Sequence, residues 1–164
     1  TKRGTQRFLY VRGCPGSGKT VVIIEGAMRC ARKGLTVVIV CPTGALVTAI
    51  KLLLPEFDGV ERILVDTLQG ILKYKRATED MVTWAPPSAF RQYDVIFCDE
   101  ASQYEDREWR RLFQTIKEQP HRPYTVVVAD FQQLQPVSGG GLCQRMCLQM
   151  PTIELKRRAK RQCP

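Results

Sequence analysis

Short apolar runs recur along the chain and are separated by mixed polar segments. Five of these runs are rich in β-branched or aromatic residues and cover residues 8–11, 36–40, 62–65, 94–98 and 125–129. Nearly continuous apolar runs of this length are typical of strands that are covered on both faces, as in a parallel sheet. The pattern therefore predicts five buried strands in a mostly parallel sheet.

Two longer segments have the periodicity of helices. Residues 18–34 end with two basic residues before Gly34, which is a helix stop signal. Residues 107–116 place four apolar side chains on one face, namely Trp109, Leu112, Phe113 and Ile116. Alternating strands and helices predict an α/β domain with helices on both faces of the sheet. Residues 76–93 are less regular, and we interpret "WAPPSAFRQYD", residues 84–94, as a surface connection.

Composition and charge narrow the class of partner and the compartment. The chain has 164 residues, a net charge of +9 and seven cysteines without a Cys-x-x-Cys pair. The positive charge favours nucleic acid as a partner, although a solvated basic surface gives the same charge. The basic run at residues 156–161 also has the composition of a nuclear localisation patch. The cysteines predict a reducing, intracellular compartment, and the apolar runs are too short to cross a membrane.

The segment "GCPGSGKT", residues 13–20, fits the phosphate-binding motif G-x-x-x-x-G-K-[ST] between a strand and a helix. Its glycines let the backbone wrap a phosphate, and the helix N-terminus faces the phosphate oxygens. Lys19 is predicted to reach the β and γ phosphates of a nucleotide, and Thr20 to offer a hydroxyl to Mg²⁺. The predicted phosphate-binding residues are Gly13, Gly16, Ser17, Gly18, Lys19 and Thr20.

Two acids follow the apolar run at residues 94–98. Asp99 suits a Mg²⁺ ligand that acts through water, and Glu100 suits the base that orients an attacking water. In a parallel sheet, this strand end lies at the same edge as the phosphate loop. An acidic pair in a solvated turn is the alternative, and the accompanying phosphate-binding motif favours the catalytic interpretation.

A third strand end carries an acid followed by amides, in "VVVADFQQLQPV" at residues 126–137. Asp130 is predicted to lie at the same edge, beside the bound nucleotide. Gln133 is predicted to contact the γ-phosphate and so to distinguish ATP from ADP, because an amide donates and accepts hydrogen bonds without adding charge. Gln132 is predicted to be a neighbour without that contact. Two surface amides without a role are the alternative.

Five segments together resemble the superfamily one helicases, most closely the Pif-type and RecD-like branch. They are "GCPGSGKT", "VIVCPTGALV", "VDTLQGIL", "DVIFCDEAS" and "VVVADFQQLQPV", in the order and rough spacing of that family over residues 8–140. The resemblance implies a RecA-like P-loop NTPase fold, the first motor domain of an ATP-driven DNA helicase, with ATP and Mg²⁺ as ligands. It implies contacts to single-stranded DNA, with RNA left open, by Pro42, Thr43, Gly44, Thr67 and Gln69.

The same resemblance predicts how the chain is divided. Residues 1–150 are expected to form the motor domain, and residues 151–164 the truncated start of a second motor domain that would supply an arginine finger. Without that domain the chain is expected to bind nucleotide but to hydrolyse it slowly. Three positions depart from the family pattern: Ala129 stands where the family has glycine, Gln135 where it has proline, and Gln69 where it often has histidine.

Two other functions compete with this interpretation. One is a P-loop small-molecule kinase, which needs a lid with arginines and a pocket for the phosphate acceptor. The acidic pair and "QLQP" do not indicate either feature. A non-catalytic DNA-binding remnant of a helicase is favoured by the missing second domain. The loss of catalytic function that this alternative assumes is disfavoured by the intact site residues Lys19, Thr20, Asp99 and Glu100.

Overall fold

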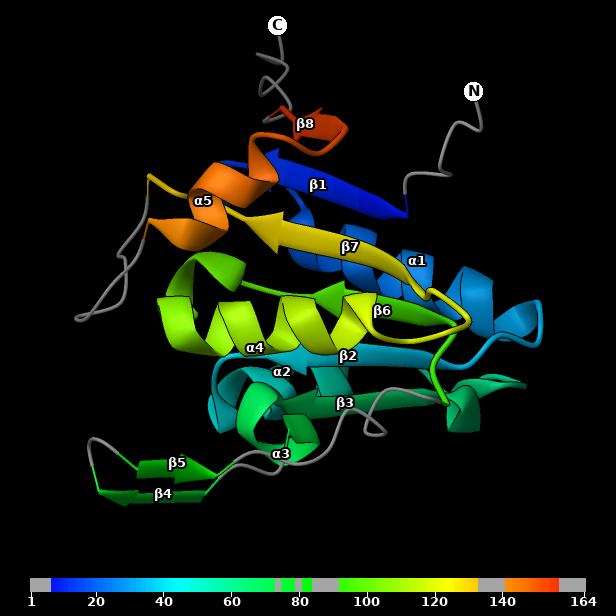
Figure 1. Cartoon of the computed structure of the whole chain (residues 1–164). Coiled ribbons are helices and arrows are strands. Elements are labelled where there is room, and N and C mark those ends of the chain that lie inside the picture. The colour runs from blue at the N-terminus through cyan, green and yellow to red at the C-terminus, as the bar shows by residue number, and fades with distance from the viewer. Residues whose placement is uncertain (1–6, 73–74, 79–80, 84–91, 133–140, 157–164) are drawn as a thin grey trace, which may run out of the picture.

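A six-stranded sheet forms the centre of the molecule, and all its strands are parallel (Figure 1). The computed structural model describes residues 7–72, 75–78, 81–83, 92–132 and 141–156. The strand order across the sheet is β3-β2-β6-β7-β1-β8. The strands are β1 (Phe8–Gly13), β2 (Val37–Cys41), β3 (Ile63–Thr67), β6 (Val95–Cys98), β7 (Tyr124–Ala129) and β8 (Thr152–Leu155). The five predicted strands are all present, within one or two residues of the expected positions.

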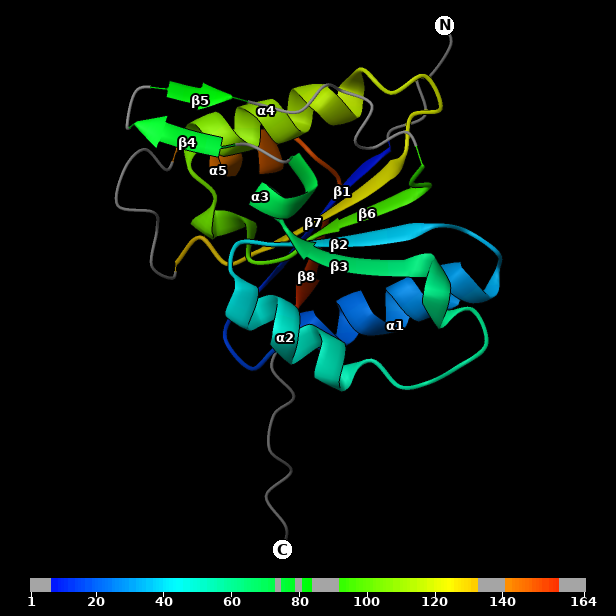
Figure 2. The same cartoon turned by 90° about the horizontal axis from the view of Figure 1, so that it is seen from below.

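Helices cover both faces of this sheet, as predicted (Figure 2). One apolar cluster joins the sheet to α1 (Lys19–Arg32) and α2 (Gly44–Leu53). A second cluster lies on the opposite face, with α3 (Leu68–Leu72), α4 (Asp106–Lys117) and α5 (Leu142–Cys147). Two short 3₁₀ helices lie between these elements, η1 (Val60–Arg62) and η3 (Ala101–Gln103). The α/β fold class is therefore confirmed.

The apolar face of α4 is buried as its periodicity predicts. Trp109, Leu112 and Ile116 are buried, and Phe113 packs against the same cluster. The helix begins with a capping box, in which the Glu105 side chain accepts from the N3 backbone and the Glu108 side chain accepts from the Glu105 amide. Such a reciprocal cap satisfies two amide donors that the first helical turn leaves open.

Several elements were not predicted from the sequence. β4 (Lys75–Thr78) and β5 (Met81–Thr83) form an antiparallel pair that the sequence did not predict. Most of the segment interpreted as a surface connection follows β5 and lies outside the described residues. Helix α2 was not predicted, because its many apolar residues are spread around the helix and do not mark one face clearly. Strand β8 pairs with β1 beyond the predicted boundary at residue 150, and the division of the chain there stays a prediction.

Within the described part of the chain, no helix is both long and apolar enough to span a membrane.

Candidate active site

The loop between β1 and α1 has a backbone that only glycine adopts without strain. Gly16 and Gly18 have φ angles of 73° and 92°, in the left-handed region, and Gly18 directly precedes α1. At Gly13 the constraint is space, because a Cβ there would collide with Ser17 Oγ and lie 3.0 Å from Leu155 Cβ. The motif glycines therefore give the loop its compact path.

Lys19 is the first residue of α1 and its side chain folds back over the loop. It is only 7% exposed, and its Nζ donates to the carbonyls of Gly13 (2.8 Å) and Cys14 (3.2 Å). The ammonium is thus held at the end of β1, where the helix N-terminus also favours negative charge. This arrangement places a fixed cation where the sequence predicts the β and γ phosphates.

The other predicted phosphate-binding residues lie in the same loop. The Ser17 amide donates to the Cys14 carbonyl (3.1 Å). Its hydroxyl is buried, with no hydrogen-bond partner among the described residues. Thr20 is the second residue of α1 and is half-buried. The Ser17 amide therefore bridges the two sides of the loop. The binding of Mg²⁺ by Thr20 stays a prediction.

The two acids form a sharp turn at the end of β6. Asp99 is only 1% exposed; its amide donates to the Val40 carbonyl (2.9 Å), and its Oδ1 accepts from the Glu100 amide (2.9 Å). Glu100 has a φ angle of 44°, a left-handed conformation that is rare for a residue other than glycine. Strained backbone of this kind persists where surrounding contacts hold it, often at functional sites.

The turn presents two carboxylate oxygens that have no donor. Asp99 Oδ2 and Glu100 Oε2 are buried and lack a hydrogen-bond partner within the described part of the chain. Buried polar atoms are ordinarily satisfied, so such orphans indicate a missing ion or water. Magnesium is typically held by one or two carboxylates together with substrate phosphates. The residues present therefore fit a hydrated Mg²⁺ beside a nucleotide, with Asp99 and Thr20 as the residues that would hold it.

The same burial changes the protonation of Asp99. Burial raises the pKa of Asp99 from 3.8 to about 6, and repulsion from Glu100 adds to this effect. The Glu100 amide and the Lys19 ammonium act in the opposite direction, without cancelling it. Because β1 and β6 both run parallel to β7, the phosphate loop after β1 and the acidic turn after β6 lie at the same edge of the sheet, as the sequence predicts.

Replacing Asp99 by asparagine is expected to stabilise the folded chain at neutral pH. Asparagine keeps the size and the acceptor for the Glu100 amide, but it carries no charge to desolvate. A pKa displaced from 3.8 to about 6 corresponds to about 3 kcal/mol of unfolding free energy at pH 7. Urea unfolding measures the gain, with Asp58→Asn in an exposed loop as the control.

The gain from Asp99→Asn also has a predicted pH dependence. In the wild type the folded state binds the Asp99 proton more tightly than the unfolded state does. This contribution to stability is fully present below about pH 4 and is lost as the pH rises through about 6. The variant and the wild type should therefore converge near pH 4. A stability difference that is equal at pH 4 and pH 7 would contradict the assignment.

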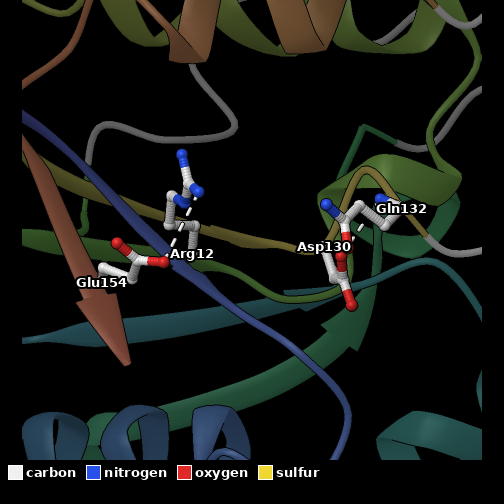
Figure 3. Close-up of polar contacts among 4 residues, drawn as sticks. All are labelled: Arg12, Asp130, Gln132 and Glu154. Atoms are coloured by element: carbon white, nitrogen blue, oxygen red, sulfur yellow. Dashed lines mark hydrogen bonds and ion pairs between the residues drawn. The ribbon is translucent and has the colours of Figure 1, made fainter. Parts of the chain in front are cut away.

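Asp130 also lies at this edge. The register pairs Arg12 with Ala129, so the next residues, Gly13 and Asp130, follow at neighbouring strand ends. Asp130 is buried, and its Oδ1 accepts from the Gln132 amide (3.0 Å) in a tight turn (Figure 3). Gln132 is exposed. Gln133, the predicted γ-phosphate contact, lies outside the described residues.

A cavity of about 360 Å³ adjoins the phosphate loop on the α5 side of β1. Gly13, Asp130 and Gln132 contribute to its lining, together with the ion pair between Arg12 and Glu154 (3.5 Å; Figure 3). Both partners of this pair are about half exposed, so the pair is worth at most about 1 kcal/mol. It links β1 to β8, a contact that sequence reasoning missed because β8 was not predicted.

The two segments predicted to contact DNA lie side by side. The register pairs Cys41 with Thr67, so Pro42 and Thr43 follow β2 next to the end of β3. Each threonine caps a helix: Thr43 Oγ1 accepts from the Leu46 amide (3.3 Å), and Thr67 Oγ1 accepts from the Gly70 amide (3.0 Å). Thr43, Gly44 and Gln69 are exposed. The structure therefore gathers these predicted residues on one edge, and their DNA contacts stay a prediction.

Tyr104 is a site residue that sequence reasoning missed. Its hydroxyl lies 2.9 Å from the Val40 carbonyl and 3.1 Å from the Asp99 carbonyl. The only sequence signal is an aromatic residue five positions after Asp99. Nothing in the sequence pairs Tyr104 with a residue 64 positions earlier, because that contact depends on the order of strands in the sheet.

A protein-family model described as an AAA domain matches residues 2–163. No curated protein matches the chain. The match to the family model covers nearly the whole chain, including the phosphate loop, the acidic turn and β8.

Solved structures of Pif1 helicases have a similar fold. A Pif1 helicase from Candida albicans shares 19% identity with a TM-score of 0.57, over 90% of this chain and 36% of that one. A double mutant of a Pif1 helicase from Bacteroides shares 15% identity with a TM-score of 0.60, over 97% of this chain and 40% of that one. A structure described as Bacteroides Pif1 bound to single-stranded DNA shares 16% identity with a TM-score of 0.52, over 91% of this chain and 38% of that one. These likenesses confirm the RecA-like helicase fold, and the chain spans about two fifths of the length of these proteins.

Proposed function

The chain belongs to the AAA domain family, and on that premise we propose that it binds MgATP as the first motor domain of an ATP-dependent DNA helicase. The observation that carries the proposal is the edge of the sheet where Lys19 lies against the loop and the acidic turn presents two carboxylate oxygens that find no donor among the described residues. A cation for phosphates and a buried acidic pair at neighbouring strand ends suit the hydrolysis of a phosphoanhydride.

Each residue then has a defined part in hydrolysis. Lys19 neutralises charge that builds up on the β and γ phosphates. Glu100 accepts a proton from the attacking water. A bound Mg²⁺ would neutralise phosphate charge, held by Thr20 and, through water, by Asp99. Gln133 is proposed to contact the γ-phosphate, beside Asp130.

The turnover of the isolated chain is proposed to be slow. In P-loop GTPases an arginine supplied in trans is worth about 10³- to 10⁵-fold in rate, and a second motor domain is proposed to supply such an arginine here. In the whole protein, ATP would close the two domains and step them along single-stranded DNA.

The DNA path is proposed to cross the adjacent ends of β2 and β3. The segment after β2 exposes Thr43 and Gly44 at the N-terminus of α2, where backbone amides favour a phosphate. Gln69 is exposed next to it, on α3. The net charge of +9 favours a polyanion, and one similar protein is described as bound to single-stranded DNA.

Replacing Gln69 by glutamate is expected to weaken binding of single-stranded DNA. The substitution keeps the size of an exposed side chain and adds a negative charge where a phosphate is proposed to lie. A like charge at a surface site is worth about 1 kcal/mol, or roughly fivefold in affinity. The anisotropy of a labelled poly-dT oligonucleotide measures the change in affinity at fixed salt.

The matched control is Gln149→Glu, an exposed residue after α5 that changes net charge equally. If both variants weaken binding to the same extent, the effect is one of overall charge and the proposed DNA path is wrong. If wild type does not bind poly-dT at low salt, the proposal that this domain engages DNA fails.

A further inference from the structure

The hydroxyl of Tyr104 ties two strand ends together beneath the acidic turn. The residue is only 1% exposed, and its Oη lies 2.9 Å from the Val40 carbonyl on β2 and 3.1 Å from the Asp99 carbonyl after β6. The Val40 carbonyl also accepts from the Asp99 amide (2.9 Å). The Tyr104 hydroxyl therefore contacts both the carbonyl that accepts from the Asp99 amide and the carbonyl of Asp99 itself.

The chain reaches this position by folding back on itself. After Glu100 adopts its left-handed conformation, η3 turns the chain, with the Gln103 amide donating to the Glu100 carbonyl (2.9 Å). The Tyr104 amide then donates to the Ala101 carbonyl (3.2 Å). This path brings the Tyr104 ring under the turn it has just left.

The Asp99 carbonyl belongs to the peptide that joins the two acids. The orientation of this peptide plane sets ψ of Asp99 and φ of Glu100, because the two dihedrals flank a planar unit. A donor on the Asp99 carbonyl therefore restrains the backbone from which both side chains project. The left-handed φ of 44° at Glu100 needs such support, since a residue with a Cβ does not favour it.

The ring itself is held in place by packing. It stacks on Trp109 with a centroid distance of 6.3 Å and an interplanar angle of 26°. It lies in the apolar cluster that also contains Cys98 and Ala101. Burial raises the pKa of Tyr104 well above its ordinary value, so the hydroxyl keeps its proton at neutral pH.

We propose that Tyr104 is a positioning residue for ATP hydrolysis, whose hydroxyl fixes the peptide between Asp99 and Glu100 and so aims both carboxylates into the site. This inference rests on the proposed function of the same site. Tyr104 is buried beneath the turn and acts through the two acids. Loss of an outer contact of this kind typically lowers metal affinity or rate by about 10- to 100-fold.

The test compares Tyr104→Phe with Tyr93→Phe. The first keeps the ring and removes only the hydroxyl beneath the turn. The second removes the hydroxyl of another buried tyrosine in the same apolar cluster, at the opposite end of β6. Binding of a fluorescent ATP analogue is measured with Mg²⁺ and with EDTA, and single-turnover hydrolysis with the chain in excess. Thermal midpoints report on folding for each variant.

Tyr104→Phe is expected to lower the gain in affinity that Mg²⁺ provides by about tenfold, while affinity in EDTA stays unchanged. Single-turnover hydrolysis should slow to a similar or greater extent. Tyr93→Phe should leave both unchanged. A purely structural role for Tyr104 would instead weaken binding equally with Mg²⁺ and with EDTA, in step with the thermal midpoint.

Two negative results have different meanings. If Tyr104→Phe keeps the full Mg²⁺ effect, the inference about Tyr104 is overturned and the proposed function stands. If wild type shows no Mg²⁺-dependent nucleotide binding, the proposed function is overturned and the inference with it. Should Tyr104→Phe fold poorly, both tyrosine variants are compared with wild type below the thermal midpoint of Tyr104→Phe, where the proposal predicts the same selective loss of the Mg²⁺ effect.

Discussion

Replacing Glu100 by glutamine is expected to slow ATP hydrolysis by about 10²- to 10⁴-fold while leaving nucleotide affinity nearly unchanged. Glutamine has the size of glutamate but cannot accept a proton from water at neutral pH. Glu100 Oε2 is buried and accepts no hydrogen bond within the described residues, so the protein does not already use this acceptor. Lys19 and the loop, which bind the phosphates in this account, are not altered by the change.

Single-turnover hydrolysis with the chain in excess is the suitable measurement, because turnover of the isolated domain is proposed to be slow. Glu118→Gln is the matched control, since Glu118 is exposed at the far end of α4. A variant that hydrolyses ATP at the wild-type rate would show that another group takes the proton. A variant that loses nucleotide binding would show that Glu100 acts in binding rather than in catalysis.

Replacing Trp109 by alanine is expected to lower the unfolding free energy by about 3–5 kcal/mol. Trp109 is among the largest fully buried side chains of the described residues. Its ring stacks on Tyr104, and its Nε1 donates to the Met146 sulfur on α5 (3.1 Å). The truncation leaves a cavity where η3, α4 and α5 meet, and the surrounding sheet cannot collapse into it.

Urea unfolding measures this effect, and Leu52→Ala is the control. Leu52 is also a large apolar residue, but it is 81% exposed on α2 and should change stability by less than about 0.5 kcal/mol. Because Trp109 supports Tyr104, its truncation should also reduce the Mg²⁺ effect on nucleotide affinity in whatever fraction stays folded. A loss below about 1 kcal/mol would mean that the core around α4 is not packed as described.

The central strands were predictable because burial on both faces leaves a clear mark in the sequence. β2 and β6 consist of buried residues alone, so their apolar runs are unbroken. β8 lies at the edge of the sheet, with three of its four residues exposed, and its pattern is indistinct. β4 has the sequence "KRAT", which lacks the apolar run of a buried strand. Strands at a sheet edge or in a two-stranded pair form because of their pairing with another strand, which local periodicity does not encode.

Some features of the candidate site were likewise predictable from the sequence, and others depend on the fold. The phosphate loop has a motif because its glycines and lysine act through local backbone geometry. Asp99, Glu100 and Asp130 were found because parallel strands end at one edge of the sheet. The raised pKa of Asp99 comes from burial and from Glu100, and burial is visible only in the fold. The contacts of Tyr104 likewise depend on β2 lying beside β6.

The most direct test of the account is the affinity of the chain for a fluorescent ATP analogue with Mg²⁺, in wild type and in Lys19→Ala. Losing the charged donor at the phosphates should weaken binding by about 10- to 150-fold. Lys33→Ala, an exposed lysine after α1, should leave the affinity unchanged. Binding by wild type that depends on Lys19 but not on Lys33 is the predicted result. Wild type without measurable binding, or equal affinity in Lys19→Ala, would contradict the claim that this edge of the sheet is an ATP site.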